Sequence, residues 1–414
     1  MSNASTKADT HGRHDDESRI EREIDENESA EELLLGADSD TEPVLSIVMP
    51  TMNEEEGIAE CIERTKRALE TAGLTGEIIV SDSSSDRTPE IAREMGAIVV
   101  EPDGKGYGYA YRYAFDRTRG EYIVMGDADT TYDFEQIPRL LEPVRNGDAD
   151  MVMGSRLEGE IKDGAMPALH QHVGNPLLTK FLNVFYEAGV SDAHSGFRVF
   201  SKAAYDEMDL ETDGMEFASE MIMEAGARDL TIDETPIVYH EREGEETLES
   251  FKDGWRHVRF MLVNAPGYLF SIPGLVIGAL GVVLMGLAAT GTSVGGAMFG
   301  VRTMIAGSLL TMVGYQVGSF GVFSTVASDP IRKPDDRLTH WLTTAVSLER
   351  GATIGTLMVA TGGLYAAYSL YVWLTQGYAM LPSVVANIGA FTLLVLGMQT
   401  VFSAFFLSTL AQRN

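Results

Sequence analysis

The chain has 414 residues, of which 44% are hydrophobic, and its 62 acidic and 31 basic side chains give a formal net charge of -31. A surface this acidic repels phosphate backbones, which excludes nucleic acid as a general partner. Its one cysteine, Cys61, excludes an internal disulfide and is typical of a reducing compartment. We interpret the acidity as a solvated surface of the kind found in salt-loving organisms, without catalytic meaning.

The N-terminal segment, residues 1–42, is rich in Asp, Glu and Ser and nearly devoid of aromatic residues. Such a composition cannot bury enough surface to fold alone, so we predict a disordered acidic tail. No basic segment followed by an apolar stretch occurs there, and a cleaved signal peptide is not expected.

Strands and helices are expected to alternate from residue 43 to about 250. Short apolar, β-branched runs predict strands over 44–49, 77–80, 97–100, 122–125 and 150–154. Helices are expected over 54–72 and 106–117, with another that begins at Pro89. This alternation predicts a mostly parallel sheet in an α/β domain.

The strand expected over 122–125 ends in two acids, Asp127 and Asp129. In an extended segment, side chains two residues apart point the same way, so the two carboxylates can share one divalent cation at the carboxyl edge of the sheet. Ligand sites in open α/β sheets collect at that edge, and oxygen ligands favour Mg²⁺ or Mn²⁺. The alternative is a plain turn, because Asp favours turns, and the motif alone leaves both interpretations open.

Two other polar stretches have functional candidates. The glycine-rich run 103–108 fits neither a P-loop nor a dinucleotide fingerprint, but its flexible backbone would let Lys105 reach a phosphate. A plain turn without a phosphate contact is an equally good interpretation of this run. His170 and His172 have no companion acid or cysteine at ligand spacing, so they are expected to be surface residues.

The C-terminal third is predicted to be a membrane domain over 268–414. Uncharged runs predict four spans near 268–290, 303–327, 352–374 and 384–410. Aromatic and basic residues over 251–267 predict an interfacial helix at the membrane surface. The loop after the second span holds the basic residues Arg332, Lys333, Arg337 and Arg350. By the positive-inside rule this loop, the α/β domain and the C-terminus are cytoplasmic.

The strand ends resemble family 2 glycosyltransferases, in the branch of dolichyl-phosphate mannosyl- and glucosyltransferases, over about 45–260. The loop with Pro50, Asn53 and Glu54 looks like the family's P-x-x-N-E loop, and Asp82 lies in a turn similar to its DDGSxDxT. The other matches are the DxD (Asp127, Asp129), the GSR (Arg156), the DxxSGFR (Asp192, Arg198) and the R-x-G-E-S-K segment (Arg242). This sequence departs from the family at Ser81, Ser83, Glu246 and Thr247, the last of which replaces a phosphate-binding lysine.

The resemblance implies a GT-A-type, Rossmann-like sheet followed by four spans. It implies inverting transfer of one hexose from a nucleotide-sugar, UDP- or GDP-hexose, to a polyprenyl (dolichyl) phosphate, which supplies lipid-linked sugar for protein glycosylation or surface glycans. Mg²⁺ or Mn²⁺ would bind Asp127 and Asp129. The expected nucleotide contacts are Pro50, Asn53, Glu54, Asp82, Lys105 and Asp127. Arg156, Arg198 and Arg242 would hold phosphates, and Asp192 would orient the acceptor or a second metal.

Two alternatives remain at this point. A processive polysaccharide synthase is disfavoured because Trp255-Arg256 lacks the Gln of the Q-x-x-R-W acceptor motif. A transporter or flippase with a nucleotide-sensing domain is disfavoured because the predicted spans carry no Asp, Glu, Lys or Arg for a polar pathway.

Overall fold

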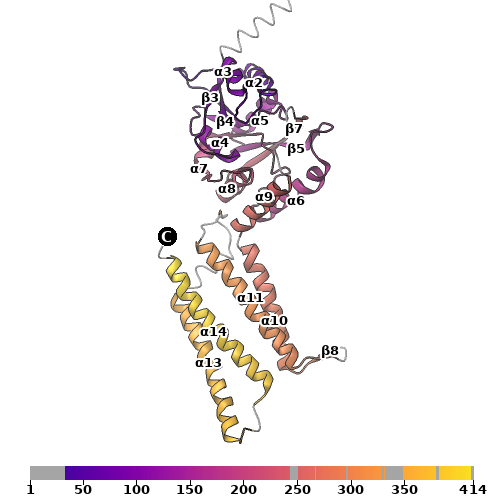
Figure 1. Ribbon diagram of the computed structural model, residues 1–414, viewed down its shortest axis with the longest axis vertical. Coiled ribbons are helices and arrows are strands. Elements are labelled where there is room, and N and C mark those ends of the chain that lie inside the picture. Colours follow the sequence, from indigo (N-terminus) through magenta and orange to yellow (C-terminus); the bar gives the residue numbers. More distant parts are fainter. Residues whose placement is uncertain are drawn as a thin grey trace, which may run out of the picture. The chain divides into compact units, whose positions relative to one another are not determined.

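The computed structural model describes residues 33–242, 250–265, 267–294, 297–327, 331, 348–378 and 382–411. The chain forms two compact units, Met1–Val258 and Arg259–Asn414, each with its own architecture (Figure 1).

The first unit is built on a seven-stranded sheet with strand order β3-β2-β1-β4-β6-β5-β7. The strands are β1 Leu45–Thr51, β2 Gly76–Asp82, β3 Ile98–Val100, β4 Tyr122–Met125, β5 Met151–Ile161, β6 Arg198–Ser201 and β7 Ile232–Tyr239. Only β6 runs antiparallel to its neighbours, β4 and β5, while the other pairings are parallel. The prediction of a mostly parallel GT-A-type sheet is therefore confirmed.

Helices cover both faces of this sheet (Figure 1). The helices of this unit are α2 Ile58–Ala72, α3 Thr88–Glu94, α4 Tyr107–Phe115, α5 Ile137–Arg145, α6 Asn175–Tyr186, α7 Lys202–Glu207 and α8 Phe217–Ala227, with the 3-10 helix η1 Phe134–Gln136 and the π-helix η2 His170–Gly174. The helix α9 Ser250–Asn264 contains the boundary between the two units. Alternate residues of β1 enter different cores, since Ile47 packs in the cluster with α2 and α5 and Val48 in the cluster with α4 and α8. A strand buried on both faces reads as a continuous apolar run, which is why it could be predicted.

Part of the segment expected to be a disordered tail belongs to this unit. Leu34 forms a parallel bridge with Gly76, and the Leu35 amide donates to the Gly76 carbonyl over 2.8 Å. The Arg119 guanidinium donates to the carbonyls of Gly36 and Ser39. Part of the segment 33–42 is thus held at the sheet by hydrogen bonds from the backbone and from the Arg119 side chain, which composition alone does not reveal. Residues 1–32 lie outside the described residues.

The second unit contains α10 Ile272–Ala289, α11 Val301–Ala327, α13 Leu348–Thr375 and α14 Val384–Ala411, the turn η3 Gly267–Ser271 and a hairpin of β8 Ser293–Val294 and β9 Ala297–Met298. Four helical stretches are long and apolar enough to cross a membrane, namely Leu269–Ala289, Val301–Ser324, Glu349–Thr375 and Val384–Leu410. The prediction of four spans is confirmed. Glycines allow α10 and α11 to approach closely, since a Cβ on Gly314 would lie 2.3 Å from the Gly278 amide nitrogen.

Candidate active site

The candidate site lies where β1, β2 and β4 end. The chain builds β2 and β3 on one side of β1 and then places β4 on the other side, so the strand order reverses between β1 and β4. Ligands of open α/β sheets bind outside the carboxyl ends of the strands at such a reversal. The loops that follow Thr51, Asp82 and Met125 meet at this edge, and the Thr51 hydroxyl ties the first two strands by donating to Asp82 over 2.7 Å.

Asn53 shapes the first of these loops. It adopts a left-handed backbone conformation, with φ of 62°, in place of the helical start that the sequence favoured from residue 54. Its side-chain oxygen accepts from the Ser85 amide at 2.8 Å, and its own amide donates to the Ser84 hydroxyl at 2.8 Å. Asn53 therefore fastens the loop after β1 to the loop after β2. The predicted nucleotide contact at Asn53 would use a side chain that already holds the loop.

Three acids, Glu54, Asp127 and Asp129, form what we call the carboxylate cluster. Asp127 accepts a hydrogen bond from the Tyr107 hydroxyl at 2.9 Å, and the Thr131 hydroxyl donates to Asp129 at 2.5 Å. Tyr107 therefore fixes one carboxylate of the predicted DxD from α4, and Thr131 fixes the other from within its own loop.

The electrostatics of the cluster show charge that is only partly balanced. Burial raises the pKa of Asp127 to about 6, and the neighbouring Asp129 adds to the shift. Burial also raises the pKa of Glu54 to about 7 against the opposing effect of Arg242, and the charges of Asp129 and Asp127 raise it further. These raised pKa values favour either protonation of the carboxylates or binding of an added cation beside them.

Arg242 lies on this cluster. Its Nη2 is 2.5 Å from Glu54 Oε1, and its Nη1 is 3.6 Å from Asp129 Oδ2. Its Nε is buried and has no hydrogen-bond partner among the described residues. The guanidinium predicted to hold an acceptor phosphate is thus paired with two carboxylates at the sheet edge.

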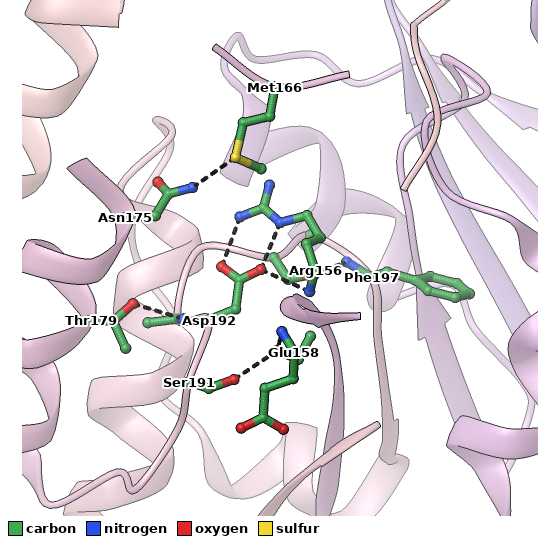
Figure 2. Close-up of polar contacts among 12 residues, drawn as sticks. Arg156, Glu158, Met166, Asn175, Thr179, Ser191, Asp192 and Phe197 are labelled. Carbon is green, nitrogen blue, oxygen red and sulfur yellow. Dashed lines mark hydrogen bonds and ion pairs between the residues drawn. The ribbon is translucent and has the colours of Figure 1, made fainter. Parts of the chain in front are cut away.

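Arg156 and Asp192 form a buried ion pair beside α6 (Figure 2). Arg156 Nε and Nη2 donate to the two oxygens of Asp192 at 2.7 and 2.8 Å, and the Arg156 amide adds a third bond at 3.0 Å. Asp192 is 0% exposed, and the Arg156 charge and its hydrogen bonds hold the pKa of this carboxyl low although burial opposes them. Both oxygens are engaged by Arg156, and the role expected for Asp192 in orienting the acceptor or a second metal stays a prediction. The pair braces the loop that contains Asp192.

Arg198 is fully buried at the start of β6. Its Nε donates to the Ser195 carbonyl at 2.9 Å and its Nη2 to the Ala193 carbonyl at 3.0 Å, so it folds the loop back on itself. Burial lowers the pKa of the guanidinium to about 10. The side chain is 0% exposed, and its predicted contact with a phosphate stays a prediction.

The remaining predicted residues lie at the same edge of the sheet or near it. Asp82 accepts from Thr51 and, at 3.3 Å, from the Ser84 amide, and Pro50 lies in β1 opposite Ser81. Lys105 is exposed before α4 and makes no hydrogen bond or ion pair with the described residues. Its contact with a phosphate stays a prediction.

Several residues of the site were missed from the sequence. Tyr107 and Tyr111 both donate to Asp127, and their spacing of four residues on α4 was an available signal. Tyr132 accepts from the Gly196 amide at 2.8 Å, and a Cβ on Gly196 would lie 3.2 Å from Asp127 Oδ2. The SGFR loop therefore approaches the DxD closely at its glycine, a contact that no local pattern could reveal.

Comparison with known proteins assigns the chain to a family. The model of glycosyl transferase family 2 matches residues 46–209, and that of the family 2 C-terminal transmembrane region matches 322–411. The low-salt glycan biosynthesis hexosyltransferase Agl6 of Haloferax volcanii is 63% identical over 94% of this chain and 94% of that protein. The chain belongs to glycosyl transferase family 2. It is therefore a glycosyltransferase.

This family 2 glycosyltransferase has further relatives. The dolichyl-phosphate hexose transferase of Haloferax volcanii is 34% identical over 51% of this chain and 89% of that protein. A solved structure of glucosyl-3-phosphoglycerate synthase from Mycobacterium tuberculosis is 22% identical, covers 53% of this chain and 79% of that chain, and has a TM-score of 0.44.

The carboxylate cluster of this glycosyltransferase fits a hard divalent cation. Across the described residues, no group of three or more His, Cys, Asp or Glu side chains is arranged to hold a metal by itself. Mg²⁺ is commonly bound through one or two carboxylates, with substrate phosphates and water as the other ligands. Asp127 and Asp129 offer that number of carboxylates, and their unbalanced charge favours a cation.

The buried pair supports a first prediction. Asp192→Ala should lower the free energy of unfolding by about 3–5 kcal/mol, because it leaves the Arg156 charge buried without its partner. The measurement is chemical unfolding of the detergent-solubilised full chain. Glu160→Ala, which removes an exposed partner of Lys162, is the control and should leave the free energy of unfolding nearly unchanged. Unchanged stability with lost activity would instead indicate a direct role for Asp192 in the reaction.

Proposed function

We propose that this glycosyltransferase moves one hexose from a nucleotide-sugar, UDP- or GDP-hexose, to a polyprenyl (dolichyl) phosphate, with inversion at the anomeric carbon. The observation that carries the proposal is the carboxylate cluster at the strand-order reversal between β1 and β4. The names of two relatives, a hexosyltransferase and a dolichyl-phosphate hexose transferase, support the sugar class and the acceptor class.

A divalent cation is part of this proposal. The donor's diphosphate is strongly negative, and a protein with a net charge of -31 would repel it unless the charge were neutralised locally. Mg²⁺ or Mn²⁺ bound by Asp127 and Asp129 would supply Lewis-acid stabilisation of the leaving diphosphate.

The protein's own residues would bind and orient the two substrates. A polyprenyl phosphate is already anionic at neutral pH, so its attack needs no strong general base, and no carboxylate has to be assigned that role. Arg242 would contribute a guanidinium fork for phosphate oxygens at the edge where it now pairs with Glu54. The Arg156–Asp192 pair would hold the neighbouring loop in position without touching substrate.

The DxD pair gives the test of this function. Asp127→Asn and Asp129→Asn should each reduce hexose transfer by about a hundredfold or more, because each removes a hard ligand and a stabiliser of developing negative charge. Transfer is measured as labelled organic-soluble product from membranes. Asp133→Asn is the matched control, since Asp133 caps η1 and Asn serves equally well as a cap. Full activity of both DxD variants, including in the presence of EDTA, would contradict the proposed cation.

Arg242 gives a third prediction, with two readouts that move in opposite directions. Arg242→Ala should abolish transfer, while Mn²⁺ binding to the detergent-solubilised protein without nucleotide should tighten on the order of tenfold, because one competing positive charge is removed. Binding is measured by the electron paramagnetic resonance signal of free Mn²⁺. Arg93→Ala removes an exposed arginine paired with Glu101 and should change neither readout. Weaker Mn²⁺ binding by Arg242→Ala would contradict the competition.

We further propose that the catalytic unit faces the cytoplasm, on the basis of the basic residues between the second and third spans. Cysteines that replace Thr292 and Gln376, in the two loops that the proposal puts outside, should react with a membrane-impermeant maleimide in intact cells. A cysteine at Arg337 should not react. The native Cys61 is buried and should give no background. Labelling at position 337 but not at 292 or 376 would reverse the topology.

A further inference from the structure

The first turn of α4 is capped by a loop that lies far along the chain. Gly106, the residue before α4, has no side chain that could cap the helix. The carbonyl of Asp213 takes this place, since it accepts from the amides of Gly108 at 3.0 Å and of Tyr109 at 3.3 Å. We call residues 209–214, which lie between α7 and α8, the clasp loop. The start of α4 therefore depends on a segment outside the helix.

Two glycines bring backbone against backbone at this contact. A Cβ on Gly106 would lie 2.1 Å from the Asp213 carbonyl oxygen, and one on Gly108 would lie 2.2 Å from the Thr212 carbonyl oxygen. Gly106 also has a φ of 125°, which residues other than glycine rarely adopt. Because backbone atoms cannot turn aside as a flexible side chain can, this fit leaves α4 no room to shift toward the clasp loop.

The clasp loop is itself held from two helices. The Thr212 amide donates to both carboxylate oxygens of Glu220 on α8, at 3.2 and 3.0 Å, and Glu220 is buried. Arg112 of α4 forms an ion pair with the Asp213 carboxylate and donates to the Leu210 carbonyl at 3.3 Å. The loop is thus fixed to the core through α8 and fastened to α4 through Arg112.

Tyr107 connects this contact to the carboxylate cluster. It is the first residue of α4 and stands between the two glycines that meet the clasp loop. Its hydroxyl donates to Asp127 Oδ1 at 2.9 Å, and the hydroxyl of Tyr111, one turn later, donates to the same oxygen at 3.3 Å. Because both bonds end on Oδ1, they fix the rotation of the Asp127 carboxylate and leave its Oδ2 free of both tyrosines.

We propose that the clasp loop is a positioning element for hexose transfer, with Arg112 and Asp213 as positioning residues that act through Tyr107 on Asp127. By fixing the start of α4, the loop fixes the Tyr107 hydroxyl and with it the orientation in which Asp127 meets a cation. A misplacement of about 1 Å in a catalytic site can lower a rate about a hundredfold. The inference rests on the proposed function only in this last step, since the orientation of Asp127 can be tested without substrate.

Gly108→Ala tests the clasp by adding one methyl group against the Thr212 carbonyl. Gly174→Ala is the matched control, because a Cβ there would make its nearest contact at 3.7 Å, an ordinary van der Waals distance. The full chain in detergent is compared by hydrogen–deuterium exchange, without metal or substrate. Exchange is measured at two segments, the start of α4 over 107–111 and the loop after β4 over 126–131.

We expect Gly108→Ala to speed exchange several-fold at both segments and Gly174→Ala to change neither. Tyr107→Phe deletes the hydroxyl but keeps the clasp, so it should speed exchange only at the loop after β4. In the double variant Tyr107→Phe/Gly108→Ala, that loop should exchange no faster than in Tyr107→Phe alone, because both changes act through the same hydrogen bond.

Arg112→Ala is a second variant that loosens the clasp without adding an atom, so the test stands even where Gly108→Ala does not fold. It should give the same pattern of exchange with a smaller amplitude. Mn²⁺ binding to Gly108→Ala, followed by the electron paramagnetic resonance signal of the free ion, should weaken several-fold. A protein that shows this pattern of exchange but transfers no hexose would contradict the proposed function and leave the positioning of Asp127 intact.

Two outcomes would overturn the positioning. One is unchanged exchange at the loop after β4 in the folded Gly108→Ala and Arg112→Ala variants, which would show that the clasp does not reach Asp127. The other is additive acceleration of that loop in the double variant, which would show that the clasp acts by a route other than Tyr107.

Discussion

The candidate site depends on negative charge that the protein does not fully balance. Glu54, Asp127 and Asp129 meet where β1 and β4 end, and Arg242 is the cation paired with two of them. Burial and mutual repulsion raise the pKa of Glu54 to about 7 and that of Asp127 to about 6. Keeping carboxylates in such surroundings costs free energy unless a cation or a proton joins them. Binding of a divalent cation together with the donor's diphosphate would explain why the carboxylates are kept together at this cost.

The rest of the catalytic unit serves to hold these few groups in place. The reversal of strand order opens the edge, and Asn53 locks two loops there in a left-handed backbone conformation. Tyrosines from α4 fix Asp127 from one side, and the glycine of the SGFR loop approaches it closely from another. The buried Arg156–Asp192 pair and α6 hold that loop in turn. In this account, acids and arginines of similar appearance in the sequence have different tasks, which their burial and their partners distinguish.

The sequence predicted the parts of the structure that depend on local pattern. The strand over 122–125 and the four apolar spans were predicted correctly, because each corresponds to a continuous run of hydrophobic residues in the sequence. The buried partners of Asp192 and Arg198 could not be predicted, because no motif states whether a charged side chain meets substrate or a buried partner. Tyr107 and Tyr111 were missed although their spacing on α4 was an available signal. The approach of Gly196 to Asp127 joins segments that lie far apart in the sequence, so no local pattern could reveal it.

The central claim is that the carboxylate cluster supports transfer of a single hexose to a lipid phosphate. The most direct test incubates membranes that contain the full chain with a panel of labelled UDP- and GDP-hexoses, a divalent cation and a polyprenyl phosphate, followed by organic extraction. We expect one labelled lipid that carries a single sugar and that fails to form when EDTA is added. A polymeric product, or no product from any donor while the folded protein still binds nucleotide, would contradict it.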